Sequence, residues 1–418
     1  MNSRAEAFPA LAFDAIGERY QNAVAAFTVL AFSSGIPVYV YSSAGIGLAP
    51  LHWVYLVVLL AVPIAFRPDA VLRALQSRLV TWCGVYLTAT LAAYLLSSRS
   101  GVAQQELQQR ALTAIAIPTF TLIFSSPRAI RTARVALVAV VLAAVALNFY
   151  EVMRPQTLSA VYGRSAGFYI NPNISATAIT VGMTLCIGVV SSRWRDAFAA
   201  LAGLGVLVTL SRGLLIAFVF ALIVLWSAGA IRMGRAVLIG AMLLVAGAIA
   251  VVVTLGIETT MAALRLATQS GIIDRLVDPS VAMGGADYST NLRMEEARAA
   301  WQQFMDSPLI GNGVASTIEW EVHSSTHNIY LRHLAEYGVL GILLFPGLIL
   351  AIFAGVRQPE RVQIGAFAVA ILVAGMFSHN VLDEWDALIA FALAAAMSVQ
   401  SRVALGPVAR RGSATTAA

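Results

Sequence analysis

Apolar stretches long enough to cross a lipid bilayer recur along almost the entire sequence, and this pattern decides the fold class. A transmembrane helix needs about 20 consecutive, mostly apolar residues. Twelve candidate stretches begin near Asn22, Leu51, Leu79, Ala111, Thr132, Ile174, Ala197, Gly213, Ala236, Ile329, Arg361 and Asp386. Only 11% of the residues are charged, whereas a soluble domain carries about 25%. The sequence therefore predicts an all-α polytopic membrane protein with about twelve transmembrane helices.

Arginine supplies every basic residue of the chain, and its distribution between the predicted loops indicates the orientation. With the N-terminus in the cytoplasm, 17 of the 27 arginines fall on the cytoplasmic side, together with six of the 21 acidic residues. Basic loops on the cytoplasmic side are the usual topology signal. The net charge of +6 is therefore explained by topology, and we do not interpret it as a nucleic-acid-binding surface.

The predicted helices divide the chain into three parts. Residues 1–255 form a membrane domain of about nine helices, and residues 328–418 form a second membrane domain of about three helices with a cytoplasmic tail. Residues 256–327 form a large exterior loop that contains a helix over about 291–306. Thr290 or Asn291 can cap this helix, and Glu295 and Glu296 suit its first turns. Gly311 and Gly313 predict a turn after it.

Three arginines on the exterior side are candidates for binding a phosphorylated substrate. Arg212 stands in a very short connection between two apolar helices, where a guanidinium is costly unless an anion accompanies it. Arg164 precedes Asn173 at the mouth of a helix, and Arg293 lies near the start of the exterior helix. Guanidinium groups suit phosphate because they donate two parallel hydrogen bonds. The alternatives are an interfacial anchor for Arg212 and solvated surface charges for the other two.

His327 is the candidate general base. It lies where the long polar loop gives way to an apolar helix, and the positive end of a helix dipole favours the neutral imidazole that a base requires. Asn328 and Tyr330 follow directly and, with Asn173, are further candidates for substrate contact. The alternative for His327 is a capping or interfacial residue.

Two groups of side chains could instead bind a metal ion. Glu319, His323 and His327 have the spacing of ligands on one helix face, although the segment shows no helical pattern. Asp383, Glu384 and Asp386 cluster in the last exterior loop. A short acidic loop on the exterior side is the commoner explanation for the second group.

Four motifs in order resemble the O-antigen ligase and polymerase superfamily. They lie between residues 160 and 345, on the exterior side of the predicted topology. The motifs are Arg164 to Asn173, Thr209 to Gly213, Arg293 to Gly313, and His327 to Gly338. One departure is Ser325, which stands where many relatives have a second histidine.

The resemblance implies a glycosyltransferase of the bacterial inner membrane whose active site faces the periplasm. Its donor would be a glycan on undecaprenyl diphosphate, and its acceptor a hydroxyl group of the lipid A–core oligosaccharide. By residue matching, Arg212 and Arg293 correspond to the essential arginines of the family and His327 to its essential histidine. Ligases of the family use no metal cofactor, and arginines would bind the pyrophosphate in its place.

Three alternatives to an O-antigen ligase stay open. They are an O-antigen polymerase, a ligase that transfers the glycan to protein, and a transporter of lipid-linked sugars. Polymerases of this kind often carry Arg-x10-Gly in two exterior loops, and no exterior arginine here has a glycine eleven residues later. A transporter should place charges at the bilayer midplane, whereas here they gather at one surface. Both arguments favour the ligase.

Overall fold

The protein is built from helices packed into a bundle, as the sequence predicts. The computed structural model describes residues 7–44, 50–161, 163–255, 288–320 and 326–403, and these contain helices and no strands. Four described helical segments are long and apolar enough to cross a membrane. Two further pairs of helices, each sharply bent at a short break, raise the number to six if each pair is one span. The chain is thus an all-α protein with several membrane-span candidates.

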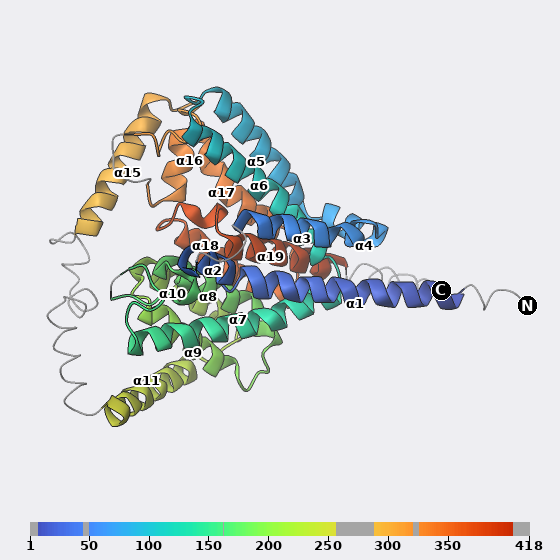
Figure 1. Cartoon of the computed structure of the whole chain (residues 1–418), viewed down its shortest axis with the longest axis vertical. Helices are drawn as coiled ribbons and strands as arrows, with labels where there is room; N and C mark the ends of the chain where they lie inside the picture. Colours follow the sequence, from blue (N-terminus) through green and yellow to red (C-terminus); the bar gives the residue numbers. More distant parts are fainter. Residues whose placement is uncertain (1–6, 45–49, 162, 256–287, 321–325, 404–418) are drawn as a thin grey trace, which may run out of the picture.

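The order of the helices can be followed in Figure 1. They are α1 (Ala7–Phe32), α2 (Ile36–Ala44), α3 (Pro50–Ala65), α4 (Pro68–Leu75), α5 (Arg78–Leu95), α6 (Gly101–Ile123), α7 (Pro127–Met153), η1 (Gly167–Tyr169), α8 (Pro172–Cys186), η2 (Ile187–Val189), α9 (Arg195–Val208), α10 (Arg212–Ser227), α11 (Met233–Leu255), α15 (Tyr288–Asp306), α16 (Ile329–Tyr337), η3 (Gly338–Leu340), α17 (Gly341–Phe353), α18 (Glu360–Ala374), η4 (Asn380–Leu382) and α19 (Trp385–Val403).

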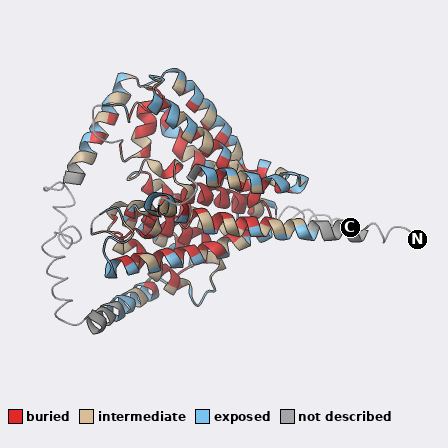
Figure 2. Cartoon of the chain, viewed as in Figure 1, coloured by how far each residue is buried: buried red, intermediate tan, exposed pale blue. Residues whose placement is uncertain are grey.

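Two helices form the centre of the bundle. Nearly every residue of α8 and α19 is buried, because α8 packs against α7, α9, α10 and α18, and α19 packs against α6, α8, α17 and α18. Both helices are rich in small residues, which allow neighbouring helices to approach closely. Figure 2 shows buried positions inside the bundle and exposed positions along its outer faces.

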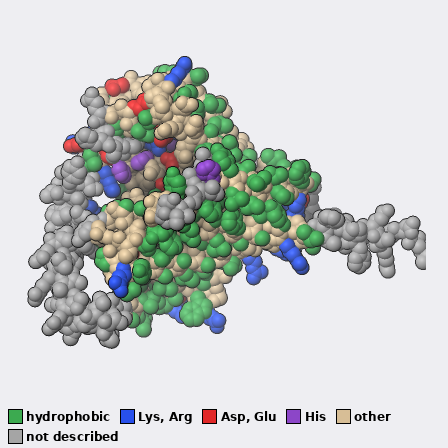
Figure 3. Space-filling model, viewed as in Figure 1, with side chains coloured by type: hydrophobic (Ala, Val, Ile, Leu, Met, Phe, Trp, Pro, Cys, Tyr) green, Lys and Arg blue, Asp and Glu red, His purple; other side chains and the backbone are tan. Residues whose placement is uncertain are grey.

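The outer faces of the bundle carry large apolar side chains. Examples are Leu59, Leu95, Val135 and Leu350, each of which is more than half exposed. Apolar side chains cover much of the surface in Figure 3. Exposed apolar area on this scale is typical of a surface that contacts lipid or another protein, which agrees with the membrane-span candidates.

Helix α15 runs along one side of the molecule beside α16 (Figure 1). It begins at Tyr288, so the predicted start at Asn291 is one turn late, and the proposed caps Thr290 and Asn291 lie inside the helix. Its C-terminal end is fixed to α16 through Asn312, whose side-chain nitrogen donates to the carbonyl oxygens of Gln303 (2.7 Å) and Ala335 (3.0 Å). This attachment places α15 next to the residues that precede α16.

Several helix ends meet at one end of the bundle. The Ser211 hydroxyl group, just before α10, donates to the Asn173 side chain at the start of α8 (2.8 Å). The first backbone N–H of α16, at Ile329, donates to the carbonyl oxygen of Gly375 after α18 (3.0 Å). The starts of α8, α10 and α16 and the end of α18 are therefore neighbours, and the candidate site lies among them.

Candidate active site

A polar pocket opens at this end of the bundle. It is lined by the start of α8, by His327 and by the segment that joins α18 to α19. Its polar lining residues are Asn171, Asn173, Thr177, His327, Ser378, His379, Asn380, Glu384 and Asp386. Figure 3 shows acidic, basic and histidine side chains gathered in a recess on this side of an otherwise largely apolar surface. Three of these lining residues, Asn171, Asn173 and His327, belong to the sequence motifs.

His327 is paired with a buried carboxylate. Its Nδ1 lies 2.9 Å from Oε2 of Glu296, which is fully buried on α15, whereas the His327 side chain is 34% exposed. An ionised carboxylate only accepts hydrogen bonds, so it favours the tautomer in which Nδ1 donates and Nε2 keeps a lone pair. A carboxylate that orients a histidine in this way leaves the other nitrogen able to accept a proton.

Arg164 and Asn173 are connected to the start of α10. Arg164 donates through Nε to the carbonyl oxygen of Thr209 (2.9 Å) and through Nη2 to Oδ1 of Asn173 (2.9 Å). The same amide oxygen accepts from the Ser211 hydroxyl group. Since Asn173 also lines the pocket with His327, it links the two groups of predicted residues.

Arg212 is the first residue of α10 and lies beside the pocket wall. The turn before it is tight, because Leu210 adopts a positive φ of 54°. The next residue, Gly213, lies so close to the Phe377 ring that a Cβ atom there would collide with it. Phe377 lines the pocket. The backbone of Arg212 therefore lies one residue before the contact between Gly213 and the Phe377 ring.

Arg293 lies on α15, three residues before Glu296. Residues three apart on a helix share a face, so Arg293 projects from the same side of α15 as the carboxylate that holds His327. It is partly buried. The three predicted arginines thus occupy three different elements around one end of the bundle.

Comparison with protein families finds a match over part of this arrangement. Residues 197–346 match the family model described as O-antigen ligase. The matched region, about a third of the chain, is similar to the O-antigen ligase family. The matched region includes Arg212, Arg293 and His327, while Arg164 and Asn173 precede it. A search of curated proteins finds no match to this chain.

Two of the residues predicted to contact substrate make structural contacts instead. Asn328 caps α16, because its Oδ1 accepts from the backbone N–H groups of Tyr330 (2.9 Å) and Leu331 (3.2 Å). The Tyr330 hydroxyl group donates to the carbonyl oxygen of Leu372 (2.8 Å), and its ring packs against Phe345. These contacts join α16 to α17 and α18. The structure does not place either residue in the lining of the pocket.

A second histidine, which the motifs do not include, faces His327 across the pocket. The rings of His327 and His379 meet edge to face, with their centroids 5.4 Å apart. Among the described residues, Nδ1 of His379 has no hydrogen-bond partner. Burial, reinforced by the nearby positive charge of Arg332, lowers the pKa of His379 to about 3. The imidazole is therefore neutral and able to hydrogen-bond a substrate hydroxyl group.

The acidic group of the last loop is divided between two environments. Asp383 pairs with Arg332, with Oδ2 lying 3.2 Å from Nη1. Glu384 and Asp386 line the pocket instead. Burial and the negative charge of the two neighbouring carboxylates raise the pKa of Glu384 to about 8. Glu384 is thus mostly protonated at neutral pH and adds little negative charge opposite a phosphorylated ligand.

The two metal-site hypotheses find different surroundings in the structure. Glu319 accepts hydrogen bonds from Ser98 (2.7 Å) and Ser100, and His323 lies outside the described residues. Asp383 is directed toward Arg332 rather than toward Glu384 and Asp386. Within the described part of the chain, no group of three histidine, cysteine or acidic side chains has the geometry to hold a metal ion.

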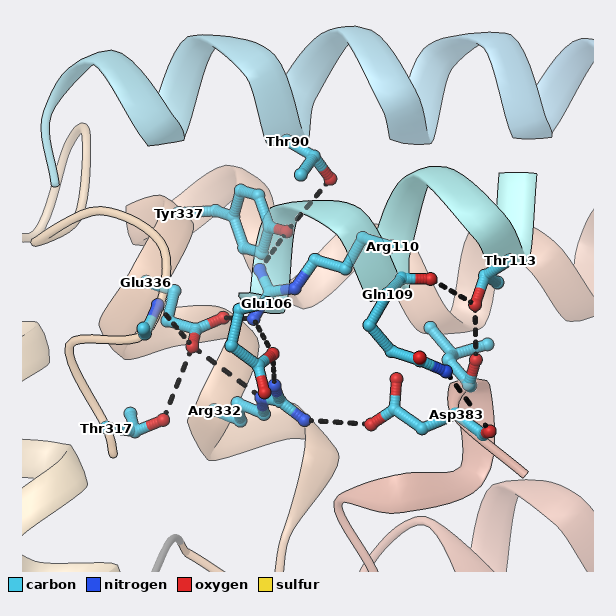
Figure 4. Close-up of polar contacts among 12 residues, drawn as sticks. Thr90, Glu106, Gln109, Arg110, Thr113, Thr317, Arg332, Glu336, Tyr337 and Asp383 are labelled. Carbon is cyan, nitrogen blue, oxygen red and sulfur yellow. Dashed lines mark hydrogen bonds and ion pairs between the residues drawn. The ribbon is translucent and has the colours of Figure 1, made fainter. Parts of the chain in front are cut away.

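A buried ion cluster joins α6, α16 and the segment between α18 and α19 (Figure 4). It consists of Glu106, Arg110, Arg332, Glu336 and Asp383. Arg110 Nη2 lies 2.7 Å from Glu336 Oε2 and 3.3 Å from Glu106 Oε2. Arg332 pairs with Glu106, Glu336 and Asp383. Each arginine therefore has at least two carboxylate partners.

Neutral groups complete the ion cluster. Arg110 donates to the Tyr337 hydroxyl group, which also bonds Thr90 (3.1 Å). Glu336 Oε1 accepts from the backbone N–H of Ala315 (3.2 Å) and from Thr317 (3.3 Å). The cluster thus ties α6 to α16, to the segment after α15 and to the loop that carries His379. It holds in place the elements that form the pocket.

Proposed function

We propose that this protein is an O-antigen ligase, which transfers O-antigen glycan from undecaprenyl diphosphate to a hydroxyl group of lipid A–core. The observation that carries the proposal is the hydrogen bond between buried Glu296 and partly exposed His327, at a polar pocket whose lining residue Asn173 accepts a hydrogen bond from Arg164. A base at the pocket and cations beside it suit a reaction in which a hydroxyl group attacks and a pyrophosphate leaves.

In the proposed reaction, Nε2 of His327 accepts the proton of the acceptor hydroxyl group while its oxygen attacks the anomeric carbon of the donor sugar. The bond between that carbon and the phosphate oxygen breaks, and its electron pair leaves with undecaprenyl diphosphate. The buried Glu296 carboxylate stabilises the imidazolium that forms. Proton transfer by such a positioned base typically accelerates a reaction by about 10²–10⁴-fold.

The arginines would carry the charge of the leaving group. Arg212 and Arg293 are assigned to the pyrophosphate, and Arg164 is assigned to it through its position beside Asn173. Planar guanidinium groups hold a phosphate oxygen pair in a fixed orientation. We propose that they do so without a metal cofactor, and activity of the purified protein should therefore persist in excess EDTA.

The proposed topology has about twelve spans, the N-terminus in the cytoplasm and the pocket facing the periplasm of the bacterial inner membrane. The uneven distribution of arginine supports this orientation. It also agrees with the donor chemistry, because activated glycan outside the cytoplasm must be supplied on a membrane lipid. A cysteine at the exposed residue Leu309 should then react with an impermeant thiol reagent in spheroplasts, and a cysteine at the exposed residue Arg131 only after lysis.

The ligase and its alternatives differ in what accumulates when the gene is deleted. Without a ligase, polymerised glycan remains on undecaprenyl diphosphate and lipid A–core receives none. Without a polymerase, lipid A–core receives a single repeat. A single-repeat band on a lipopolysaccharide gel would therefore replace the ligase assignment with the polymerase, and a normal ladder would favour protein glycosylation or transport.

Complementation makes the same experiment specific to the site. A plasmid encoding wild-type protein or His52→Ala should restore the lipopolysaccharide ladder, because His52 is an exposed histidine on α3 away from the pocket. A plasmid encoding His327→Ala should fail to restore it at equal protein abundance. Restoration by His327→Ala would remove the basis of the proposed mechanism.

A further inference from the structure

A second polar pocket lies at the opposite end of the helices that form the candidate active site. It is lined by residues that include Arg134 on α7, Gly188 after α8, Ala228 after α10 and Gln363 on α18. Helix α8 connects the two places, since Asn173 near its start lines the first pocket and Arg134 Nε donates to the carbonyl oxygen of Leu185 near its end (2.9 Å). At 1.5 Å per residue, twelve residues separate them by roughly 18 Å.

Two arginines of this pocket are held by neutral acceptors. Arg134 donates to the Leu185 carbonyl oxygen and to the side-chain oxygen of Gln363. Arg195 Nε donates to the carbonyl oxygen of Val190 (3.0 Å), and its Nη2 lies 3.4 Å from that of Gly188. Within the described ranges, neither guanidinium forms an ion pair with a carboxylate.

One acidic residue, Glu360, lines the same pocket. Two arginines and one glutamate leave the pocket with a net positive charge. Charges that are partly withdrawn from water and not neutralised by the protein favour an anionic ligand. The buried ion cluster differs in this respect, because each of its arginines is paired with carboxylates.

The backbone at Gly188 shapes the pocket around the guanidinium of Arg134. A Cβ atom at this position would collide with Nη2 of Arg134 and with the side-chain amide of Gln363. Because Gly188 has no side chain, the Arg134 guanidinium can pass close to the backbone there and reach the pocket. The cavity has a volume of about 360 Å³, which is within the range of pockets that hold a small polar ligand.

Aromatic side chains indicate the level of this pocket relative to a membrane. Trp194, adjacent to Arg195, is 58% exposed, and Trp226, near the end of α10, is 53% exposed. Arg193 stacks on the Trp194 ring, at 5.9 Å from its centroid. Exposed tryptophans at helix ends typically lie among lipid headgroups. A phosphate at this level belongs to a lipid rather than to a soluble metabolite.

We propose that this pocket binds the phosphate group of an anionic phospholipid headgroup, with Arg134 and Arg195 as its donors. The site is separate from the transfer reaction and does not depend on it. A lipid bound there would attach α7, α8, α10 and α18 to one leaflet of the membrane, at the helix ends that are distant from the active site.

The test measures lipid binding to the purified full-length protein by native mass spectrometry. Phosphatidylglycerol should bind, and phosphatidylcholine with the same acyl chains should bind more weakly. A basic side chain near a headgroup contributes about 1 kcal/mol, or about fivefold in affinity. Arg134→Gln and Arg195→Gln should each lower phosphatidylglycerol affinity by about that factor. Arg193→Gln, on the exposed neighbour that stacks on Trp194, should leave it unchanged.

A second pair of variants keeps both arginines and so guards against a folding defect. Ala228 is an exposed residue of the pocket lining. Ala228→Glu should weaken phosphatidylglycerol binding, and Ala228→Gln, of equal size without the charge, should preserve it. Equal binding by both variants would overturn the proposal, as would equal affinity for the two lipids. Inorganic phosphate that displaces phosphatidylglycerol at low concentration would assign the pocket to a soluble anion instead.

Discussion

Two glutamates are fully buried, Glu336 on α16 and Glu296 on the neighbouring helix α15, and their surroundings differ in a way that separates a catalytic role from a structural one. Glu336 is surrounded by Arg110 and Arg332, whose side chains are at most 5% exposed. Glu296 has a histidine partner that is 34% exposed and lines a pocket. The first carboxylate is enclosed by its partners, and the second connects the protein interior to a place that a ligand can enter.

The difference lies in what each ionic group could still do. Every arginine in the ion cluster is paired with carboxylates and almost fully buried, so a substrate phosphate cannot reach it. The Glu296–His327 pair leaves Nε2 directed away from its partner. A buried ionic cluster whose members all pair with one another acts as a connection between helices. A pair with one open nitrogen can transfer a proton.

The largest effect is expected from removing His327, the partly exposed member of the Glu296–His327 pair. His327→Ala should lower the transfer rate by about 10²–10⁴-fold, because it removes the positioned base. Thermal unfolding of the purified variant should change little, since His327 is partly exposed. Single-turnover transfer assays with lipid-linked donor measure the first quantity, and His52→Ala is the matched histidine control. Normal transfer by His327→Ala would make the pair structural.

Breaking the ion cluster should instead act on stability. Arg332→Met leaves three acidic groups short of a partner, and the loss of one member of a buried ionic network costs about 3–5 kcal/mol. Denaturant unfolding in detergent would measure this change. Arg298→Met, on the exposed face of α15, is the control. A loss below about 1 kcal/mol would mean that the cluster is open to water and not a connection.

The sequence predicts the elements of the site better than their partners. The short connection at Arg212, the turn near Gly311 and Gly313 and the helix that ends at Asp306 are all present, because each depends on a local sequence pattern. Arg164, Asn173 and His327, which the sequence assigns to one side of a membrane, lie at one end of the bundle.

Side-chain pairing across the fold could not be predicted. The sequence predicts Glu296 in the first turns of a helix that starts at Asn291. The helix instead starts at Tyr288, and the Glu296 side chain is buried against His327, which is 31 residues further along the chain. Arg110 and Glu336 are 226 residues apart. His379 belongs to no motif, and only the packing of α18 and α19 brings it to the pocket. Such contacts depend on helix packing, which hydropathy does not specify.

A smaller effect is expected when the buried member of the open pair is changed without changing its size. Glu296→Gln can donate to Nδ1 of His327, which moves the proton to Nε2 and removes the base. We expect about a tenfold to hundredfold loss of transfer, as is typical for a residue that orients a functional histidine. Glu295→Gln, on the neighbouring exposed residue, is the control. Full activity in Glu296→Gln would show that the hydrogen bond does not set the tautomer.

The smallest effect is expected at Asn328, where substitutions can distinguish a helix cap from a substrate contact. Its side chain accepts from two N–H groups of α16, and loss of such a cap costs about 1 kcal/mol. Asn328→Ala should therefore lower unfolding stability by about this amount. Asn328→Ser keeps an oxygen at the same place and should restore most of it.

Transfer activity then separates the two roles of Asn328. If the residue only caps α16, Asn328→Ser should transfer glycan at nearly the wild-type rate, because the hydroxyl group holds the helix start and His327 with it. If the amide contacts the sugar, Asn328→Ser should be stable and yet slow, with a raised KM for the acceptor. The structure favours the first result, since the amide oxygen already accepts two hydrogen bonds and the side chain does not line the pocket. A stable but inactive Asn328→Ser protein would extend the active site to include the helix cap itself.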